Sequence, residues 1–175
     1  MISTLREYQS KNELDQYLGD GDSVLVGAST TYPRKYYGLS VPDKNGHILK
    51  IGIVSSDQGI RPSWTPSQDL SVLVVGHDLS LSFIDISKRT INMEVPLEWI
   101  FYEFVKQPDP DSVIVLHELG VAKFDFTGRE IWSVSTPDIA QSARMKNDTT
   151  LVVKHEGSGK EMAIDVSRGS VISRH

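Results

Sequence analysis

The chain has 175 residues and, with 18 Lys and Arg against 23 Asp and Glu, a formal net charge of −5 at pH 7. This length suits one domain with a substantial core, and the acidic balance argues against a surface that neutralises nucleic-acid phosphates. The sequence contains no cysteine and no long apolar run, which excludes disulfides, thiolate chemistry and a membrane-spanning helix. Because the opening residues lack the apolar core of a signal peptide, we expect a cytoplasmic protein.

The first expected element is a helix over residues 11–18. Ser10 and Glu13 have the spacing of a capping box, in which their side chains satisfy backbone N–H groups that lack a helical partner. Gly19 can end the helix in the left-handed conformation, and Leu14 belongs to an apolar stripe on one face. We expect this helix to cover an exposed edge or end of a sheet, with partner binding as the alternative.

The next segment, residues 22–58, is predicted to be a degenerate first repeat. Its buried strand is expected at residues 24–26 and its outer strand at 48–54. The hairpin turn is expected at residues 41–46, where Pro, Asp, Asn and Gly gather. Terminal copies of a repeat array are commonly atypical, which accounts for the weak match to the copies that follow.

Three clearer copies follow, and an aspartate marks each of them. Asp85, Asp125 and Asp165 lie 40 residues apart, each between two apolar residues and followed by a Ser or Thr. A period of this size fits a four-stranded propeller blade. Upstream of each aspartate, a continuous apolar run that is typical of a buried strand ends in a histidine and an acid. These strands are predicted at residues 72–76, 113–117 and 150–155.

The repeats divide a single domain, residues 1–175. Residues 96–105 combine helical spacing with high strand propensity, and the repeat register selects a strand from about Phe101 onward. The expected divisions are a helical cap at 1–21, the degenerate repeat at 22–58, and repeats at 59–98, 99–138 and 139–175.

One repeat carries a resemblance to a known family. Residues 113–132, which read VIVLHELGVAKFDFTGREIW, resemble one blade of the quinoprotein or WD-type β-propeller repeat. The resemblance implies an all-β fold in which about four repeats form a small propeller-like or two-sheet antiparallel arrangement with one short N-terminal helix. Quinoprotein propellers build their cofactor site from more blades than this chain can form, so we expect no cofactor.

No catalytic or metal-binding pattern has the required spacing. Each repeated aspartate stands just before a turn, where its carboxylate can accept backbone N–H bonds, and we interpret it as structural. The histidines of the three copies should lie too far apart to reach one zinc ion within about 2.1 Å. We also find no nucleophile beside a base, and therefore expect no metal and no enzymatic activity.

A partner-binding surface is expected where equivalent hairpins share one end of the domain. We expect the histidine and acid of each copy to lie there, together with an aromatic and basic segment of the first repeat. Tyr and Arg in that segment favour partner binding, because these residues are frequent at interface hot spots. The candidate residues are Tyr32, Arg34, Tyr36, Tyr37, His77, Asp78, His117, Glu118, His155 and Glu156.

These features favour a non-enzymatic protein-binding domain whose acids attract a basic protein. The most specific hypothesis is a bacterial immunity protein that neutralises a basic toxin, such as a nuclease. One alternative is a propeller-like scaffold for assembly, which includes a homodimer through open sheet edges. Another is a small hydrolase or carbohydrate-binding propeller that uses Trp64, Trp99 or Trp132. Neither a nucleic-acid nor a membrane partner is expected.

Overall fold

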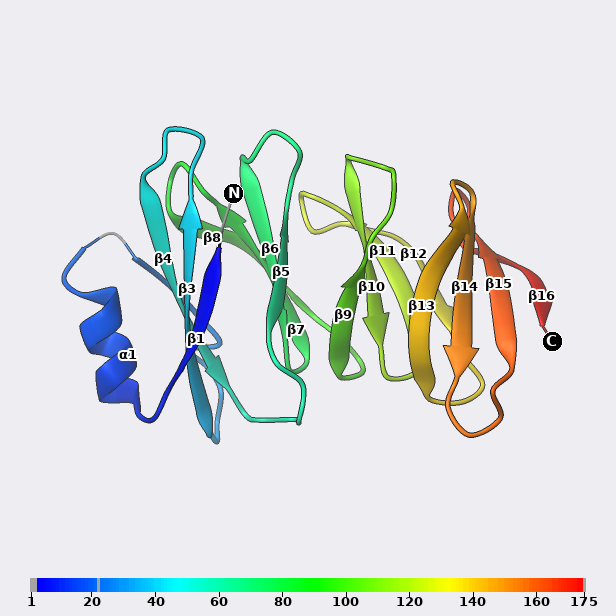
Figure 1. Ribbon diagram of the computed structural model, residues 1–175, viewed down its shortest axis with the longest axis horizontal. Coiled ribbons are helices and arrows are strands. Elements are labelled where there is room, and N and C mark those ends of the chain that lie inside the picture. The colour runs from blue at the N-terminus through cyan, green and yellow to red at the C-terminus, as the bar shows by residue number, and fades with distance from the viewer. Residues whose placement is uncertain (1–2, 22, 175) are drawn as a thin grey trace.

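The computed structural model describes residues 3–21 and 23–174, and in these residues the regular structure is β-strands and one helix, α1 (Lys11–Leu18) (Figure 1). Four sheets of four strands follow one another along the molecule. Sheet A contains β1 (Thr4–Tyr8), β3 (Lys35–Pro42), β4 (Ile48–Ser55) and β2 (Ser23–Val26), in that spatial order. Sheet B contains β5 (Ser63–Pro66), β6 (Val72–His77), β7 (Ser80–Asp85) and β8 (Thr90–Pro96). Sheet C contains β9 (Phe101–Val105), β10 (Ser112–His117), β11 (Gly120–Asp125) and β12 (Glu130–Ser135). Sheet D contains β13 (Ala140–Asn147), β14 (Thr150–His155), β15 (Glu161–Asp165) and β16 (Ser170–Arg174).

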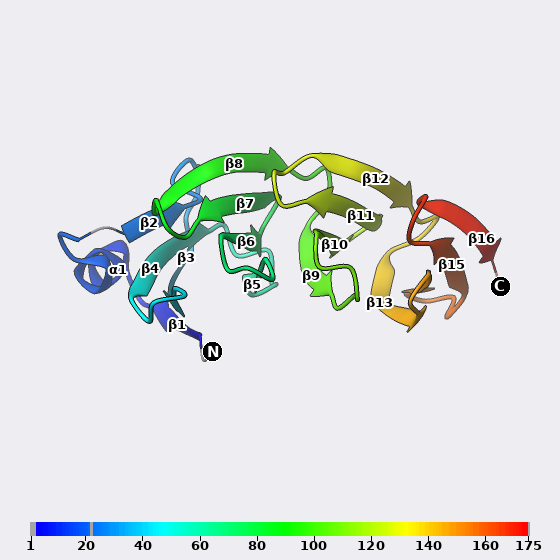
Figure 2. The same ribbon diagram turned by 90° about the horizontal axis from the view of Figure 1, so that it is seen from above.

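The four sheets form an open arc, which Figure 2 shows from above. Strands β1, β5, β9 and β13 lie on its concave side, and β8, β12 and β16 lie on its convex side. Sheets B, C and D are antiparallel meanders in chain order, as a 40-residue repeat of four strands predicts. The all-β, propeller-like fold is therefore confirmed, and the four sheets stay separate rather than merging into two.

Three apolar clusters hold the arc together, and each is shared by two successive sheets. Ile51 of sheet A packs with Leu73 of sheet B, Phe83 of sheet B with Phe101 of sheet C, and the last cluster joins sheets C and D. The continuous apolar runs noted in the sequence are the central strands β6, β10 and β14. Strands β6 and β10 are buried on both faces, whereas Lys154 of β14 is exposed.

Sheet A departs from the predicted first repeat. Thr4–Tyr8, assigned to the helical cap, instead forms the innermost strand β1 and pairs with β3. Ile48–Ser55, expected at the outer edge, lies third in the sheet, and the outer position belongs to β2, which runs parallel to β4. The prediction was wrong because these pairings join segments far apart in the chain, which a local pattern cannot specify.

Helix α1 is confirmed with its predicted bounds, and it covers the end face of sheet A (Figure 1). Ser10 accepts the backbone N–H of Glu13 (3.3 Å), while the Glu13 carboxylate accepts the N–H of Gln9 (2.9 Å). Two facing glycines, Gly38 of β3 and Gly52 of β4, let the helix approach the sheet closely. A Cβ added to Gly38 would lie 2.5 Å from the ring of Tyr17 on the helix.

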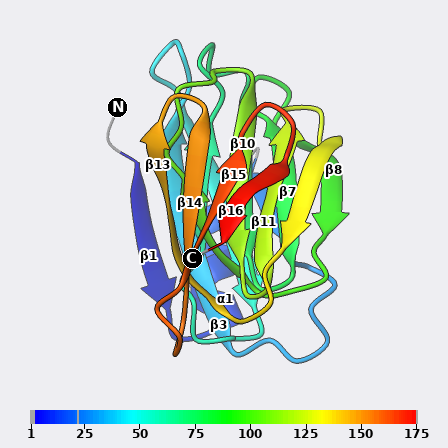
Figure 3. The ribbon, with the colours of Figure 1, turned by 90° about the vertical axis from the view of Figure 1, so that its right-hand side faces the viewer.

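The end face of sheet D differs, because none of the described helices and strands covers it in the view of Figure 3. Strands present alternate residues to opposite faces, and Leu151 of β14 points into the cluster shared with sheet C. The opposite, outward face carries Arg144, Lys154 and Glu161, and Arg144 pairs with Glu161 at 3.5 Å. This end of the arc is a charged surface.

The repeated aspartates have the structural role that the sequence predicts. The carboxylate of Asp85 accepts the backbone N–H groups of Ser87 (3.0 Å) and Lys88 (2.9 Å), and Asp125 and Asp165 make equivalent bonds in their own turns. Backbone and hydroxyl donors lower the pKa of Asp85 well below its usual range.

Among the described residues, no helix is long and apolar enough to cross a membrane.

Candidate functional site

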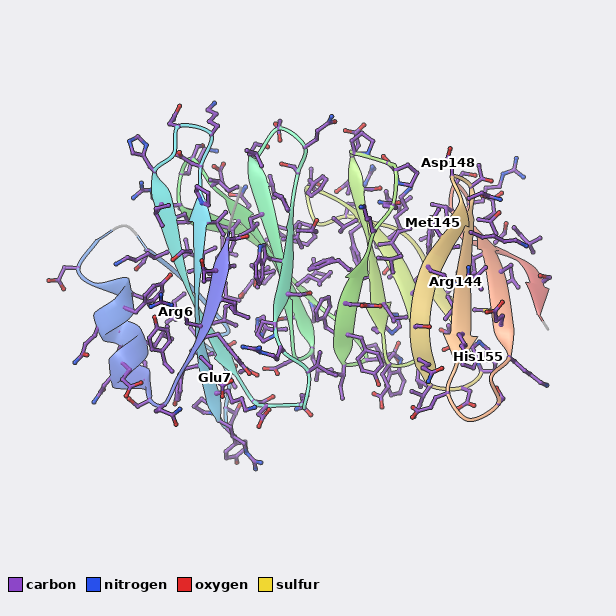
Figure 4. The ribbon with its side chains drawn as sticks, in the orientation of Figure 1. Arg6, Glu7, Arg144, Met145, Asp148 and His155 are labelled. Carbon is purple, nitrogen blue, oxygen red and sulfur yellow. The ribbon has the colours of Figure 1, made fainter. Side chains whose placement is uncertain are left out.

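The repeated histidines all lie at one end of the molecule, which we call the hairpin end. His77, His117 and His155 are the last residues of β6, β10 and β14, next to the turns that lead into the following strands. Figure 4 shows His155 at this end of sheet D and Asp148 at the opposite end. His77 and His155 are buried, whereas His117 is half-buried. The predicted clustering of the hairpins at one end is therefore correct.

The acid after each of the first two histidines links one sheet to the next through its backbone. The carbonyl of Asp78 accepts the N–H of Phe101 (2.7 Å), and the carbonyl of Glu118 accepts the N–H of Ala140 (2.8 Å). Phe101 and Ala140 begin the first strands of the following sheets. The repeated positions thus maintain the stacking of the sheets, whatever their side chains contact.

A hollow of about 460 Å³ opens at the hairpin end between sheets A and B. One wall is the segment before β3, and the other is the turn between β6 and β7 together with the end of β8. Its lining residues are Gly27, Ser29, Thr30, Thr31, Tyr32, Ser56, His77, Asp78, Leu79, Ser80, Glu94 and Pro96. It contains Tyr32, His77 and Asp78 of the predicted surface, together with Ser80 and Glu94, which the sequence analysis missed.

The hollow contains a hydroxyl beside an imidazole, contrary to the expectation that no nucleophile lies beside a base. Ser80 Oγ lies 3.0 Å from His77 Nε2, because the two residues close the hairpin opposite each other. His77 Nδ1 is 3.6 Å from Asp78 Oδ2, which is too long for a hydrogen bond, and this buried nitrogen has no partner in the described part of the chain. The arrangement lacks the bonded carboxylate that orients the histidine of a catalytic triad.

Asp78 is held in place by sheet A rather than by His77. Its two carboxylate oxygens accept the hydroxyl of Ser55 and the backbone N–H of Ser56, both at 2.8 Å. Burial opposes ionisation of Asp78, but His77 and these two donors outweigh it and lower the pKa of the carboxyl below its usual value. Asp78 also adopts a positive φ of 44° at the tip of the hairpin. It is an inter-sheet link, and not the freely exposed turn acid that the sequence indicated.

Glu94 and two large apolar side chains form the exposed rim of the hollow. Within the described residues, Glu94 makes no salt bridge, and its one hydrogen bond is a long contact from Ser82 (3.5 Å). Tyr32 is 77% exposed and Leu79 is 45% exposed. A concave surface with exposed apolar groups and a carboxylate without a cation is the kind of site that a ligand or partner covers.

The other predicted site residues divide between the core and the surface. Tyr37 is 1% exposed and belongs to the core between sheets A and B, and Tyr36 packs in the cluster beneath α1. Both lie within β3 rather than in a hairpin, so they do not contribute to the surface. Arg34 and Glu156 are exposed, and Glu118 is half-buried.

The half-buried His117 has an unusual environment. It lines a small hollow of about 120 Å³ with Trp99 and Glu130. Burial lowers the pKa of its imidazole, and the nearby carboxylate of Glu130 opposes this shift only in part.

The described residues contain no group of three His, Cys, Asp or Glu side chains that could hold a metal ion.

The tryptophans of the hydrolase or carbohydrate-binding alternative do not form one surface. Trp132 is 8% exposed and donates its indole N–H to the carbonyl of Val166 (2.8 Å). Trp64 lines a separate hollow of about 460 Å³ between sheets B and C with Phe104 and Phe126. The three rings therefore cannot make one stacking platform for a sugar.

Comparison with known proteins establishes the fold alone. No family model and no curated protein matches the chain. Among solved structures, it is similar to the dihydro-heme d1 dehydrogenase NirN in complex with DHE (TM-score 0.61, 12% identity, 80% of this chain and 34% of that one). It is also similar to Kuenenia stuttgartiensis hydrazine synthase (0.59, 15%, 90% and 49%) and to BamB from Moraxella catarrhalis (0.53, 15%, 100% and 52%). The chain thus spans a third to a half of these propeller-type proteins.

Proposed function

We propose that this chain is a non-enzymatic protein-recognition scaffold that binds its partner with the hairpin end of the arc. The observation that carries the proposal is the hollow between sheets A and B, where Tyr32 on one wall and Leu79 on the other, acidic wall are both exposed. Exposed aromatic and aliphatic groups at a concave polar site are typical of interaction surfaces. The propeller-type arc supports this reading, because it presents the turns of successive sheets together.

The strand edges on the concave side give less support to a homodimer. β1 carries Arg6 and Glu7 and β13 carries Arg144, as Figure 4 shows, while β5 ends in Pro66. Charged residues and proline on edge strands oppose pairing with another strand. A partner at the hairpin end therefore remains the better form of the scaffold proposal.

The more specific form of the proposal is an immunity protein that covers the active site of a basic toxin. It is supported by the net charge of −5 and by the acids Glu94, Glu118 and Glu156 at or near the hairpin end. Complementary charge would speed association with a basic partner. This form predicts that a stoichiometric amount of the protein inhibits a toxin domain encoded by a neighbouring gene.

The test is the kinetics of binding to the product of the neighbouring gene at low and high salt. Reversing Glu118 and Glu156 to Lys should slow association, and Tyr32→Ala should speed dissociation, because it removes an apolar anchor. Asp78 is left intact because it ties sheets A and B together. The control is Glu103→Lys, an exposed charge on the concave strand β9. Equal effects of the control and the hairpin-end variants would contradict the proposal.

The non-enzymatic part of the proposal has its own test at Ser80. A serine whose histidine lacks a bonded carboxylate should react no faster than an ordinary surface serine. Incubation with a fluorophosphonate probe followed by intact mass measurement should therefore leave the mass unchanged. Stoichiometric labelling that disappears in Ser80→Ala would instead establish a hydrolytic site.

A further inference from the structure

The hollow between sheets A and B has an unbalanced set of polar groups. Two carboxylates, Asp78 and Glu94, line it, and none of its described lining residues is a lysine or arginine. Several hydroxyls complete the wall, among them Ser29 and Thr31. The wall is therefore rich in hydrogen-bond acceptors and carries negative charge without a fixed cation.

The buried histidine provides a second, independent observation. His77 is 4% exposed, and its Nδ1 atom has no hydrogen-bond partner in the described part of the chain. Its Nε2 atom lies 3.0 Å from Ser80 Oγ and its Nδ1 atom 3.6 Å from Asp78 Oδ2, so the imidazole joins a hydroxyl and a carboxylate in the wall of the hollow. A buried polar atom without a hydrogen-bond partner is costly, and a polar group that enters the hollow beside Asp78 can remove that cost.

We infer that this hollow receives a basic side chain of the protein partner, with arginine preferred. A guanidinium carries five N–H donors in a planar fork, which suits a wall of carboxylate and hydroxyl acceptors. Tyr32, which lines the hollow and is 77% exposed, supplies an aromatic ring on which a cation can stack. A volume of about 460 Å³ is large enough for one such side chain and its flanking backbone. This inference rests on the proposed function and names the group by which the partner is recognised.

The experiment uses the full chain labelled with ¹⁵N and a probe that does not require the partner. Nα-acetyl-arginine amide is titrated against the protein, and the matched probe is the citrulline derivative, which has the same shape without the charge. The arginine probe should shift the amide signals of residues 29–32 and 77–80 and the ring nitrogens of His77, with the weak affinity of so small a ligand. The citrulline probe should bind about tenfold more weakly, since it lacks the charge that strengthens hydrogen bonds to carboxylates. The lysine derivative should rank between them, because its ammonium is a point charge.

A pair of matched variants locates the site. Glu94→Gln should weaken the arginine probe by about two- to fivefold, as expected for one exposed charge. Glu103→Gln removes an equal charge from the exposed concave strand β9 and should change nothing. Equal binding of the arginine and citrulline probes, equal effects of the two variants, or shifts confined to residues outside the hollow would overturn the inference.

The result can be separated from that of the proposed function. If Tyr32→Ala weakens binding of the partner protein while the arginine probe fails to bind, the proposed function stands and the arginine pocket is wrong. If the arginine probe binds as described while the partner ignores every hairpin-end variant, the pocket stands and the proposed docking face is wrong.

Discussion

The two ends of the arc avoid exposing an apolar sheet face in opposite ways. At the sheet A end, α1 buries Leu14 and Leu18 against an apolar sheet face that includes Val54. At the sheet D end, the outward face is left open and carries charges, among them Arg144 and Glu161. In a stacked array every internal face is apolar, so a terminal face must be covered or made polar. The comparison teaches that covering ties stability to one helix, whereas a polar face depends on no single contact.

Removing the apolar contact of the helix should have the largest effect. Leu14 is fully buried, so Leu14→Ala should lower the free energy of unfolding by about 2–5 kcal/mol through lost burial and a residual cavity. Urea denaturation measures the change. The matched substitution at the other end, Ile172→Ala, removes a side chain that is 58% exposed and should change stability by less than about 0.5 kcal/mol. Equal losses would mean that the two ends do not differ as described.

Changing the close approach of helix and sheet should have the next largest effect. In Gly38→Ala, the new methyl group would lie 2.5 Å from the ring of Tyr17 and 2.7 Å from that of Tyr8, which forces the helix outward. We expect a loss of about 1–3 kcal/mol in the free energy of unfolding. Gly21→Ala, where nothing lies within 4 Å, is the control and should be close to neutral. A neutral Gly38→Ala would contradict the close packing at this end.

The pH dependence of stability tests an interior sheet of the arc, sheet C, through His117. Burial lowers the pKa of His117 below its usual value near 6.5, so the unfolded chain takes up a proton before the folded protein does. Stability should therefore fall as the pH drops from about 7 through 6.5 to the lowered pKa. Below that pKa, His117 is protonated in both the folded and the unfolded state and causes no further change. His117→Gln should flatten that part of a plot of unfolding free energy against pH. An unchanged slope in the variant would assign the effect to other groups.

Removing the charges of the sheet D face should have the smallest effect on stability. Arg144→Leu with Lys154→Leu deletes one exposed ion pair, which contributes at most about 1 kcal/mol. The same change turns the face apolar, so we expect concentration-dependent self-association in sedimentation experiments. The control is Lys88→Leu in the turn after Asp85. This variant leaves the sheet D face intact and should self-associate no more than the unmodified protein. Self-association of both variants would show that the position of the charges is unimportant.

The features that sequence predicts well are those with short-range causes. The helix follows from the capping spacing of Ser10 and Glu13, and the turns follow from carboxylates that bond backbone groups two to four residues ahead. The central strands follow from apolar runs. Each of these depends on neighbours in the chain, so the pattern contains the whole cause.

The missed features depend on contacts between distant segments. Nothing within Thr4–Tyr8 indicates that it pairs with β3, and nothing within Ser23–Val26 indicates a parallel outer strand. At the candidate site, Glu94 comes from β8 and meets the hairpin only through folding. Ser80 could have been found, because a two-residue hairpin places it opposite His77. Tyr37 was misassigned because an aromatic residue at a strand entry reads equally as core or surface.

The two edge strands of sheet A, β1 and the parallel strand β2, also bear on the order in which the molecule folds. His77 and Ser80 close their hairpin across two residues, whereas Thr4 must find Ser40, and Val24 must find Ile51. Closing longer loops costs more chain entropy, and folding slows as the mean sequence separation of contacts rises. We therefore expect sheets B, C and D to form early from local contacts and to serve as the template for sheet A. The segment that comes first in the sequence is then the last to acquire its native structure.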